Sequence, residues 1–170
     1  TILKVFDISN STNPLVIGSL SRSYVSGLQV ISMVLSKDGQ LGFLSAGGLG
    51  IKVIDTSDSR NPTDIGSFDT AGHAWSVTLS PNERYLFVAD TTQGVQILDV
   101  LDPRNITQVG HLDGIDAKRV AFYKNLILVG NGHAGIKTYG LPEGIDVSIP
   151  GPAFSASISN ITMKAGETSS

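Results

Sequence analysis

The sequence predicts an all-β fold made of repeated four-stranded units, and three observations lead to it. First, the segment "LKVFDISNSTNPLVIGSL" at residues 3–20 is nearly repeated as "IKVIDTSDSRNPTDIGSF" at residues 51–68. A third copy, "VQILDVLDPRNITQVGHL", occupies residues 95–112. Second, the copies are regularly spaced: their aspartates, Asp7, Asp55 and Asp99, lie 48 and 44 residues apart. A period of about 40–50 residues is typical of propellers and of helical arrays.

The third observation, the hydrophobic pattern, separates these two architectures. Short runs rich in β-branched residues recur along the chain, and Gly, Asn and Asp bound them, as expected of strands. No stretch of the sequence has the 3.6-residue spacing of an amphipathic helix. Four antiparallel strands in each repeat of this length make one blade of a β-propeller. The sequence therefore predicts a β-propeller with four-stranded antiparallel blades.

The expected strands can be followed in chain order. The chain opens on a strand at residues 2–8, and the run "VISMVLS" then precedes the turn residues "KDGQ". In the clearest unit we expect strands at about 74–80, 85–90, 94–100 and 107–113. The turn "YKN" leads into "NLILVG", and a last third strand follows at residues 136–140. Residues 2–141 thus supply about three and a half blades, fewer than the 4–8 of a closed propeller.

The residues that recur in every unit are expected to be structural. A carboxylate at the end of the third strand can accept backbone N–H groups of the loop that follows. Proline after asparagine keeps the chain extended into the fourth strand. We expect such turn roles for Asp7, Asp55, Asp99, Asn13, Pro14, Asn61, Pro62 and Asn105. A scaffold needs the same residues in every blade, whereas an active site needs asymmetry.

The repeated motif resembles that of the LVIVD-repeat β-propellers of bacterial and archaeal surface proteins. Its pattern is a Gly, an aliphatic run ending in Asp, then Asn-Pro and Val/Ile-Gly. Here it reads "GIKVIDTSDSRNPTDIG" at residues 50–66 and "GVQILDVLDPRNITQVG" at residues 94–110. The resemblance covers residues 2–141, and it implies that residues 1–144 are the C-terminal part of a propeller. It also implies an extracellular or cell-surface location, but no particular chemistry, because fold does not fix function.

The repeat ends before its fourth strand. After "GIKTYG", which has Gly140 in place of the aspartate, neither Asn-Pro nor an outer strand follows. We expect upstream blades or another chain to supply the missing strand. The composition changes at about residue 145, and "VSIPGPAFSASISNITMKAGETSS" is typical of a linker that enters an immunoglobulin- or cadherin-like sandwich. Residues 145–170 are therefore expected to extend away from the propeller.

One face of a propeller gathers the loops that enter the innermost strands and those that join the second and third strands. Its residues differ from blade to blade here, as those of a binding surface would. The candidate binding residues on this channel-mouth face are Gln29, His73, Trp75, Asp90, Asp116, Lys118, Asn131 and His133. The structural alternative is that these side chains are polar because loop mouths are solvated.

Composition and motifs narrow the function further. A net charge of −3 without a Lys/Arg cluster argues against nucleic acid as the main partner. No apolar run reaches the ~18 residues of a membrane-spanning helix, and the absence of cysteine excludes disulfides and thiolate zinc sites. The sequence contains no phosphate loop, nucleophile elbow or zinc-protease motif. His73, Asp90 and His133 also lack local metal-ligand spacing, so we expect no catalytic residue, cofactor or metal.

Three functional hypotheses remain. The first is a non-catalytic exported or cell-surface scaffold that binds a protein partner or a neighbouring subunit. The second is an enzyme with a site at the channel mouth, such as a metal-assisted hydrolase or a lactonase. The third is a carbohydrate-binding propeller in which Trp75 and Tyr24 stack on sugar rings. Sequons at Asn10, Asn105 and Asn160 are compatible with export and glycosylation.

Overall fold

The computed structural model describes residues 3–21 and 29–148. Within these ranges the fold is all-β. The one helical element within them is a short 3-10 turn, η1 (Gly132–Ala134). The strands are β1 (Leu3–Asp7), β2 (Leu15–Leu20), β3 (Ser32–Leu35), β4 (Leu41–Ser45), β5 (Ile51–Asp55), β6 (Thr63–Phe68), β7 (Ser76–Leu79), β8 (Tyr85–Ala89), β9 (Val95–Asp99), β10 (Thr107–Leu112), β11 (Arg119–Tyr123), β12 (Leu126–Gly130) and β13 (Ile136–Gly140).

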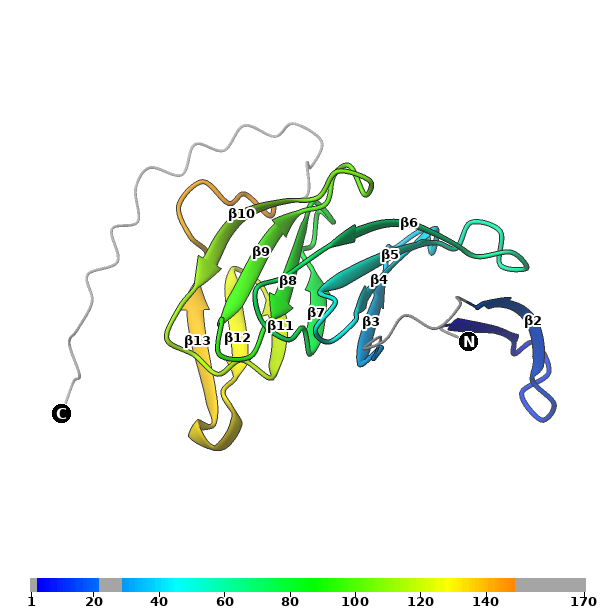
Figure 1. Cartoon of the computed structure of the whole chain (residues 1–170), viewed down its shortest axis with the longest axis horizontal. Coiled ribbons are helices and arrows are strands. Elements are labelled where there is room, and N and C mark those ends of the chain that lie inside the picture. Colours follow the sequence, from blue (N-terminus) through cyan, green and yellow to red (C-terminus); the bar gives the residue numbers. More distant parts are fainter. Residues whose placement is uncertain (1–2, 22–28, 149–170) are drawn as a thin grey trace.

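These strands form four antiparallel sheets, each in chain order. Strands β3–β6 form the first blade and β7–β10 the second blade, both complete. Within the described residues, strands β11–β13 form a third blade without an outer strand, and β1 with β2 forms a half blade. The innermost strand β7 contacts both β3 and β11, and the sheets follow one another in a row (Figure 1). The chain is a partial β-propeller, as the sequence predicts.

The strand boundaries of the second blade agree with the expected ones within two residues. The second strand of each complete blade is the most buried one. All five residues of β8 are buried, and so are the last four of β4. Strands covered on both faces lose the alternation of polar and apolar residues, so these runs read as continuous hydrophobic stretches.

The third and outer strands pair in the same register in the half blade and in both complete blades. The Asp that ends the third strand lies opposite the first residue of the outer strand. Each outer strand then has one extra residue, a β-bulge, which is followed by a glycine opposite the middle of the third strand. The bulged residues are Ile17, Ile65 and Val109, and the glycines are Gly18, Gly66 and Gly110. A bulge bends its strand and increases the local twist.

Two hydrophobic clusters fill the spaces between neighbouring blades. The first joins the first and second blades, with Phe43, Val53 and Leu86 among its buried members. The second joins the second and third blades around Phe87 and Phe122, whose rings stack with centroids 5.5 Å apart. Burial of these side chains supplies the main favourable free energy of folding. The blades are therefore held together by packing, not by backbone pairing alone.

The expectation that the chain leaves the propeller at residue 145 is wrong for residues 145–148. Residues 141–148, which we call the C-terminal strap, pack against the second cluster. Val147 is only 6% exposed there, and Leu141 and Ile145 are partly buried beside it. The Asn82 side chain also donates to the Asp146 carbonyl at 2.9 Å. Residues 149–170, and with them the expected start of a sandwich domain, lie outside the described residues.

A shortened hairpin explains why the strap packs at this point. Five residues separate β3 from β4 and β7 from β8, but only Lys124 and Asn125 separate β11 from β12. Between the first and second blades, Lys37 in one hairpin donates to Glu83 and to the Pro81 carbonyl in the next. The short hairpin of the third blade has no loop of that length, and the strap reaches the second-blade hairpin through Asn82 instead.

Candidate functional site

The loop after each third strand begins with an Asx turn. One carboxylate oxygen accepts the backbone N–H group two residues ahead, which satisfies a donor that the strand has left unpaired. The pairs are Asp7 with Ser9 at 2.9 Å, Asp55 with Ser57 at 2.9 Å, and Asp99 with Leu101 at 3.0 Å.

A second Asx turn follows three residues later in every one of these loops. Its acceptors are Asn10, Asp58 and Asp102, and its donors are the N–H groups of Thr12, Arg60 and Arg104, at 3.0 to 3.1 Å. The N–H groups of Asn13, Asn61 and Asn105 close the loops by donating to the carbonyls of the same three acceptors. Pro14 and Pro62 stand directly before β2 and β6, and Ile106 takes that place before β10. This second turn is not among those expected from the sequence, although an Asp or Asn three residues after the first Asp marks it.

These loops also reach the neighbouring blade. A Cβ atom on Gly18 would overlap the Ser59 carbonyl oxygen in the loop of the first blade. A Cβ atom on Gly66 would overlap the Pro103 carbonyl oxygen in the loop of the second blade in the same way. The repeated glycine is therefore a point of close approach between an outer strand and the next loop.

Electrostatic interactions also connect these loops, because an arginine in the loop of one blade lowers the pKa of the aspartate in the preceding blade. The hydroxyl and backbone N–H of Ser57 hold the pKa of Asp55 below its usual value, and the Arg104 charge of the next blade adds to this. The pKa of Asp7 is lowered by the backbone N–H and hydroxyl of Ser9, with a further contribution from the Arg60 charge. In the second blade Asp99 instead pairs with Arg84 of its own sheet, at 2.9 Å.

The channel-mouth face predicted from the sequence corresponds to one face of the row of blades, which we call the mouth. It is formed by the loops before β7 and β11 and by the loops that join second and third strands. Two short antiparallel bridges connect neighbouring blades there, one between Gly47 and Ala74 and one between Thr91 and Ala117. Thr91 has a φ of +52°, in the left-handed region that its counterpart Gly47 also adopts. A β-branched residue at such a φ is uncommon and strained.

His73 and Trp75 lie together at the junction of the first and second blades. Their ring centroids are 6.0 Å apart and their planes are tilted by 52°. The His73 ring lies against Gly47, where a Cβ atom would come within 2.9 Å of its Cε1 atom. The same position lies 3.6 Å from the Cβ atom of Gln29. The structure thus brings three of the candidate residues together, with Gln29 exposed and both rings half-buried.

A second group continues this row across the junction with the third blade. The Lys118 ammonium lies 5.5 Å from the centroid of the Trp75 ring, a cation–π contact. It also pairs with Asp116 at 3.0 Å, and the backbone N–H of Asp116 donates to Asn131 Oδ1 at 3.0 Å. Six candidate residues therefore form one row of neighbours from Gln29 to Asn131.

The carboxylate of Asp90, another candidate residue, is not available to bind a ligand at the mouth. It is completely buried, and its two oxygens accept hydrogen bonds from the Thr70 hydroxyl at 2.8 Å and the Gly72 N–H at 3.0 Å. Burial raises its pKa, and the bonds from Thr70 and Gly72 and the His73 charge offset some of that rise. Asn131 makes the corresponding bond in the third blade. The side chains at these two positions clamp one mouth loop to another.

Some candidates are not placed by the structure. His133 belongs to η1, and its side chain, together with Tyr24 and Asn160, lies outside the described residues. Among the described residues no three His, Asp or Glu side chains gather as a metal site would require. Asn10 and Asn105 are both exposed in the loops before outer strands.

Residues 71–113 match the LVIVD repeat family. The matched segment is the second blade together with the loop that leads into it, and it contributes His73, Trp75 and Asp90 to the mouth. Asp116, Lys118 and Asn131 come from the third blade, beyond the matched residues. No curated protein matches this sequence.

Solved structures resemble the row of blades that contains the matched segment. A protein from Lactobacillus plantarum is 17% identical with a TM-score of 0.72, over 82% of this chain and 45% of that chain. A protein from Bacteroides uniformis, named "putative 6-phosphogluconolactonase", is 16% identical with a TM-score of 0.68 over the same shares. The WD40 repeats of RRP9 are 15% identical with a TM-score of 0.51, over 69% of this chain and 37% of that chain. At these identities the likeness shows the fold alone. This chain spans less than half the length of each.

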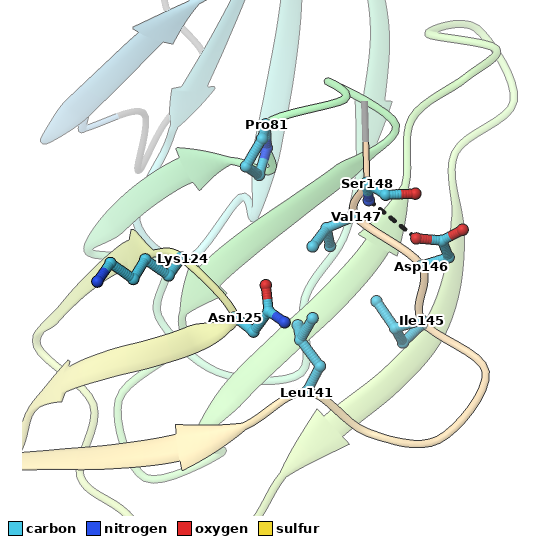
Figure 2. Close-up of a pocket in the computed structure, with 8 residues that line it drawn as sticks. All are labelled: Pro81, Lys124, Asn125, Leu141, Ile145, Asp146, Val147 and Ser148. Atoms are coloured by element: carbon cyan, nitrogen blue, oxygen red, sulfur yellow. Dashed lines mark hydrogen bonds between the residues drawn. The ribbon is translucent and has the colours of Figure 1, made fainter. Parts of the chain in front are cut away.

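A hollow of about 430 Å³ lies away from the mouth, on the side of the hairpins that precede the second strands. It separates the strap from the hairpin of the third blade. Its lining residues are Pro81, Lys124, Asn125, Leu141, Ile145, Asp146, Val147 and Ser148 (Figure 2). On the strap side the Ser148 N–H donates to Asp146 Oδ1 at 2.9 Å, which repeats the Asx turn of the loops. Within residues 3–21 and 29–148 we find no helix of the length and apolarity that crossing a membrane requires.

Proposed function

We propose that this chain belongs to a non-catalytic, exported or cell-surface propeller that acts as an interaction and assembly scaffold. The observation that carries the proposal is the open arc. Within the described residues β1 has no inner neighbour and β13 has no outer neighbour. Large apolar side chains are exposed near these ends, among them Met33, Leu35, Tyr123 and Ile136. Unpaired strand edges beside apolar patches are sites of protein association.

A groove at the half blade supports an assembly role. It has a volume of about 270 Å³ and lies between β1 and the first blade. Leu3, Val5 and Phe6 line one side of it, and Met33 and Leu35 line the other. In the complete blades the third strand pairs with β4 or β8 at this edge. Further blades from a protein partner or a neighbouring subunit would cover the groove.

The mouth supports a binding rather than a catalytic role. Its side chains differ from blade to blade, and several of the described ones contact each other, with Lys118 reaching Trp75 across a blade junction. The Lys118 ammonium contacts both the Trp75 ring and the Asp116 carboxylate. Both carboxylate oxygens of Asp90 accept hydrogen bonds from within the protein. A general acid or base must reach a substrate proton, and Asp90 is held away from the surface. The exposed sequons at Asn10 and Asn105 support the exported location.

The association state of the 170-residue chain tests the proposal. Alone in solution the chain should be insoluble or should associate, because its open edges and apolar side chains are not covered. Light scattering after size-exclusion chromatography measures this, and thermal melting reports its cooperativity. A monodisperse monomer that melts cooperatively would remove the main physical support for the scaffold.

A second candidate is an enzyme with a site at the mouth. The observation that favours it is the likeness in fold to the Bacteroides protein, together with the half-buried row of His73, Trp75 and Lys118. Fold-level likeness is weak support for chemistry. This candidate would be favoured over the scaffold if the chain hydrolysed 6-phosphogluconolactone faster than the spontaneous rate. The activity should then be lost in the His73→Ala variant or should depend on a bound metal. In the carbohydrate-binding alternative Trp75 stacks on a sugar, but Lys118 and His73 already contact that ring.

A further inference from the structure

Trp75 and Asp116 together contact an ammonium group at the mouth, and that group belongs to the protein itself. The Lys118 Nζ atom lies 5.5 Å from the centroid of the Trp75 ring and 3.0 Å from Asp116 Oδ1. An aromatic face binds cations through its quadrupole, and a carboxylate adds a charge-assisted hydrogen bond. The Trp75 ring and the Asp116 carboxylate, which we call the ammonium site, thus have the chemistry that recognises an organic cation.

The backbone on both sides of the ammonium site is fixed by the bridges between blades. Ala74 donates to the Gly47 carbonyl at 3.0 Å, and Ala117 exchanges two hydrogen bonds with Thr91 at 2.9 and 3.0 Å. Both alanines are fully buried. Because side chains alternate along an extended chain, the residues that flank these alanines point to the opposite side, where the ammonium site lies.

The two groups of the ammonium site are also oriented by their neighbours. The Trp75 ring lies against the His73 ring, with centroids 6.0 Å apart, and the His73 ring lies against Gly47. The backbone N–H of Asp116 donates to Asn131 Oδ1 at 3.0 Å. A site that is ordered before its ligand arrives loses less entropy when the ligand binds.

Lys118 is the movable part of this arrangement. Its side chain is 39% exposed and that of Asp116 is 49% exposed. Ion pairs and cation–π contacts at positions open to water are weak, and the lysine ammonium is carried on a flexible four-carbon stem. Lys118 can therefore leave the ammonium site without any change in the backbone.

We propose that the ammonium site binds a lysine side chain of a protein partner and that Lys118 is its internal competitor. The incoming ammonium group replaces that of Lys118 over the Trp75 ring and at the Asp116 carboxylate. The net charge of −3 favours a cationic partner in the same sense. This inference rests on the binding role proposed for the mouth and names the chemistry that the mouth recognises.

The structural alternative is that Lys118 only ties the third blade to the second. The two roles predict different results when the ammonium group is removed. Loss of a structural tie lowers stability and creates no affinity for lysine. Loss of an internal competitor leaves the ammonium site vacant, so that it binds an added lysine more tightly.

The fluorescence of Trp75 reports on the ammonium site directly, because Trp75 is the only tryptophan in the chain. The full 170-residue chain, carried on a solubility tag without tryptophan, is titrated with Nα-acetyl-lysine methylamide. The same compound acetylated on its side-chain nitrogen, which removes the charge, is the control ligand. We expect a saturable change in fluorescence with the charged compound alone.

Two lysine variants separate competition from net charge. Lys118→Met removes the ammonium group but keeps an unbranched apolar side chain. It should bind the charged compound roughly tenfold or more tightly than the wild type does, because a larger fraction of molecules then has a vacant site. Lys124→Met removes the same charge from another cation–π pair, with Tyr123, in a hairpin away from the mouth. It should bind as the wild type does.

Two aspartate variants in the Lys118→Met background test the carboxylate. Asp116→Asn should lose most of the affinity that Lys118→Met gains, because the ammonium group then lacks its charged acceptor. Asp113→Asn makes the same change of charge at a side chain that is 79% exposed and pairs with His111, so it should keep that affinity. Thermal melting of each variant reports any change in stability.

The proposal is contradicted if Lys118→Met gives no saturable response, or if Asp116→Asn leaves the affinity of Lys118→Met unchanged. A lower melting temperature of Lys118→Met without binding would assign Lys118 the structural role instead. Light scattering on the same samples gives the association state. A monomer that binds lysine upholds the ammonium site and contradicts the assembly role, whereas an associating chain that does not bind lysine contradicts the ammonium site alone.

Discussion

Asp90 lies fully buried at the mouth, where it accepts hydrogen bonds from Thr70 and Gly72. Its pKa is raised by burial. The folded state therefore binds the proton of Asp90 more tightly than the unfolded state does. This contribution to stability is present at low pH and is lost as the pH rises from about 4 through the folded pKa. Ionised Asp90 costs stability at neutral pH, although its hydrogen bonds are needed.

We expect Asp90→Asn to remove that cost while it keeps the hydrogen bonds. The amide oxygen can accept from Gly72, and the amide nitrogen can donate to the Thr70 hydroxyl. Urea unfolding from pH 3 to pH 8 should show that wild type loses stability relative to Asp90→Asn as the pH rises. Asp90→Ala leaves two buried donors unpaired and should cost about 1–3 kcal/mol or more. A difference between wild type and Asp90→Asn that does not change with pH would contradict this account.

At the residue scale the sequence predicts position better than role. The spacing of the inner strands places Gln29, His73 and Asp116 at equivalent positions, and the row from Gln29 to Asn131 includes all three. The burial of Asp90 could not be predicted, because it depends on Thr70 and Gly72, which come from a loop that periodicity does not describe. The contact of Lys118 with Trp75 depends on which blades are neighbours, and a single repeat does not contain that information.

At the scale of elements, the loop after the third strand combines two Asx turns with a contact to its own sheet. In the second blade Asp99 binds the Leu101 N–H through Oδ1 and pairs with Arg84 through Oδ2. The Asp99 side chain is only 17% exposed, so these contacts are partly shielded from water. The carboxylate therefore ties the loop to the hairpin between β7 and β8.

Asp99→Ala should destabilise the protein by about 1–2 kcal/mol, because it leaves the Leu101 N–H without its acceptor and Arg84 without its partner. Asp99→Asn keeps the acceptor and loses only the ion pair, so it should cost less. Urea unfolding of both variants separates the two contributions. An unchanged melting temperature for Asp99→Ala together with loss of a binding activity would show that the residue is functional rather than structural.

The strands were predictable from sequence because their signal is local. Runs such as "YLFVA" are apolar throughout, and Gly and Asn-Pro separate the strands of the repeat. The strap was not predictable, since "LPEGIDVS" has the polar and turn-forming residues of a linker. It packs because the hairpin at Lys124 and Asn125 is three residues shorter than those of the complete blades. No periodic pattern in the sequence connects this shorter hairpin with residues 141–148.

At the scale of the whole molecule, the strap completes the second hydrophobic cluster. Val147→Ala should destabilise the protein by about 2 kcal/mol, from lost burial and the cavity left behind. Val16→Ala, at an exposed position on β2, is the matched control and should have little effect. Thermal unfolding followed by circular dichroism measures both. If the two variants melt alike, the strap does not belong to the cooperative unit.

The position of the strap also decides how the propeller responds to mechanical load. A pull applied at Ser148 acts first on Val147 and on the hydrogen bond between Asn82 and Asp146. These contacts would break in succession, as in unzipping, before any force reaches the backbone ladder of β13. The strap can thus lengthen under tension while the blades stay folded. If the protein were held by the chain that follows Ser148, the mouth would lie on the side away from the attachment point. The strap would then detach and extend before any blade unfolded.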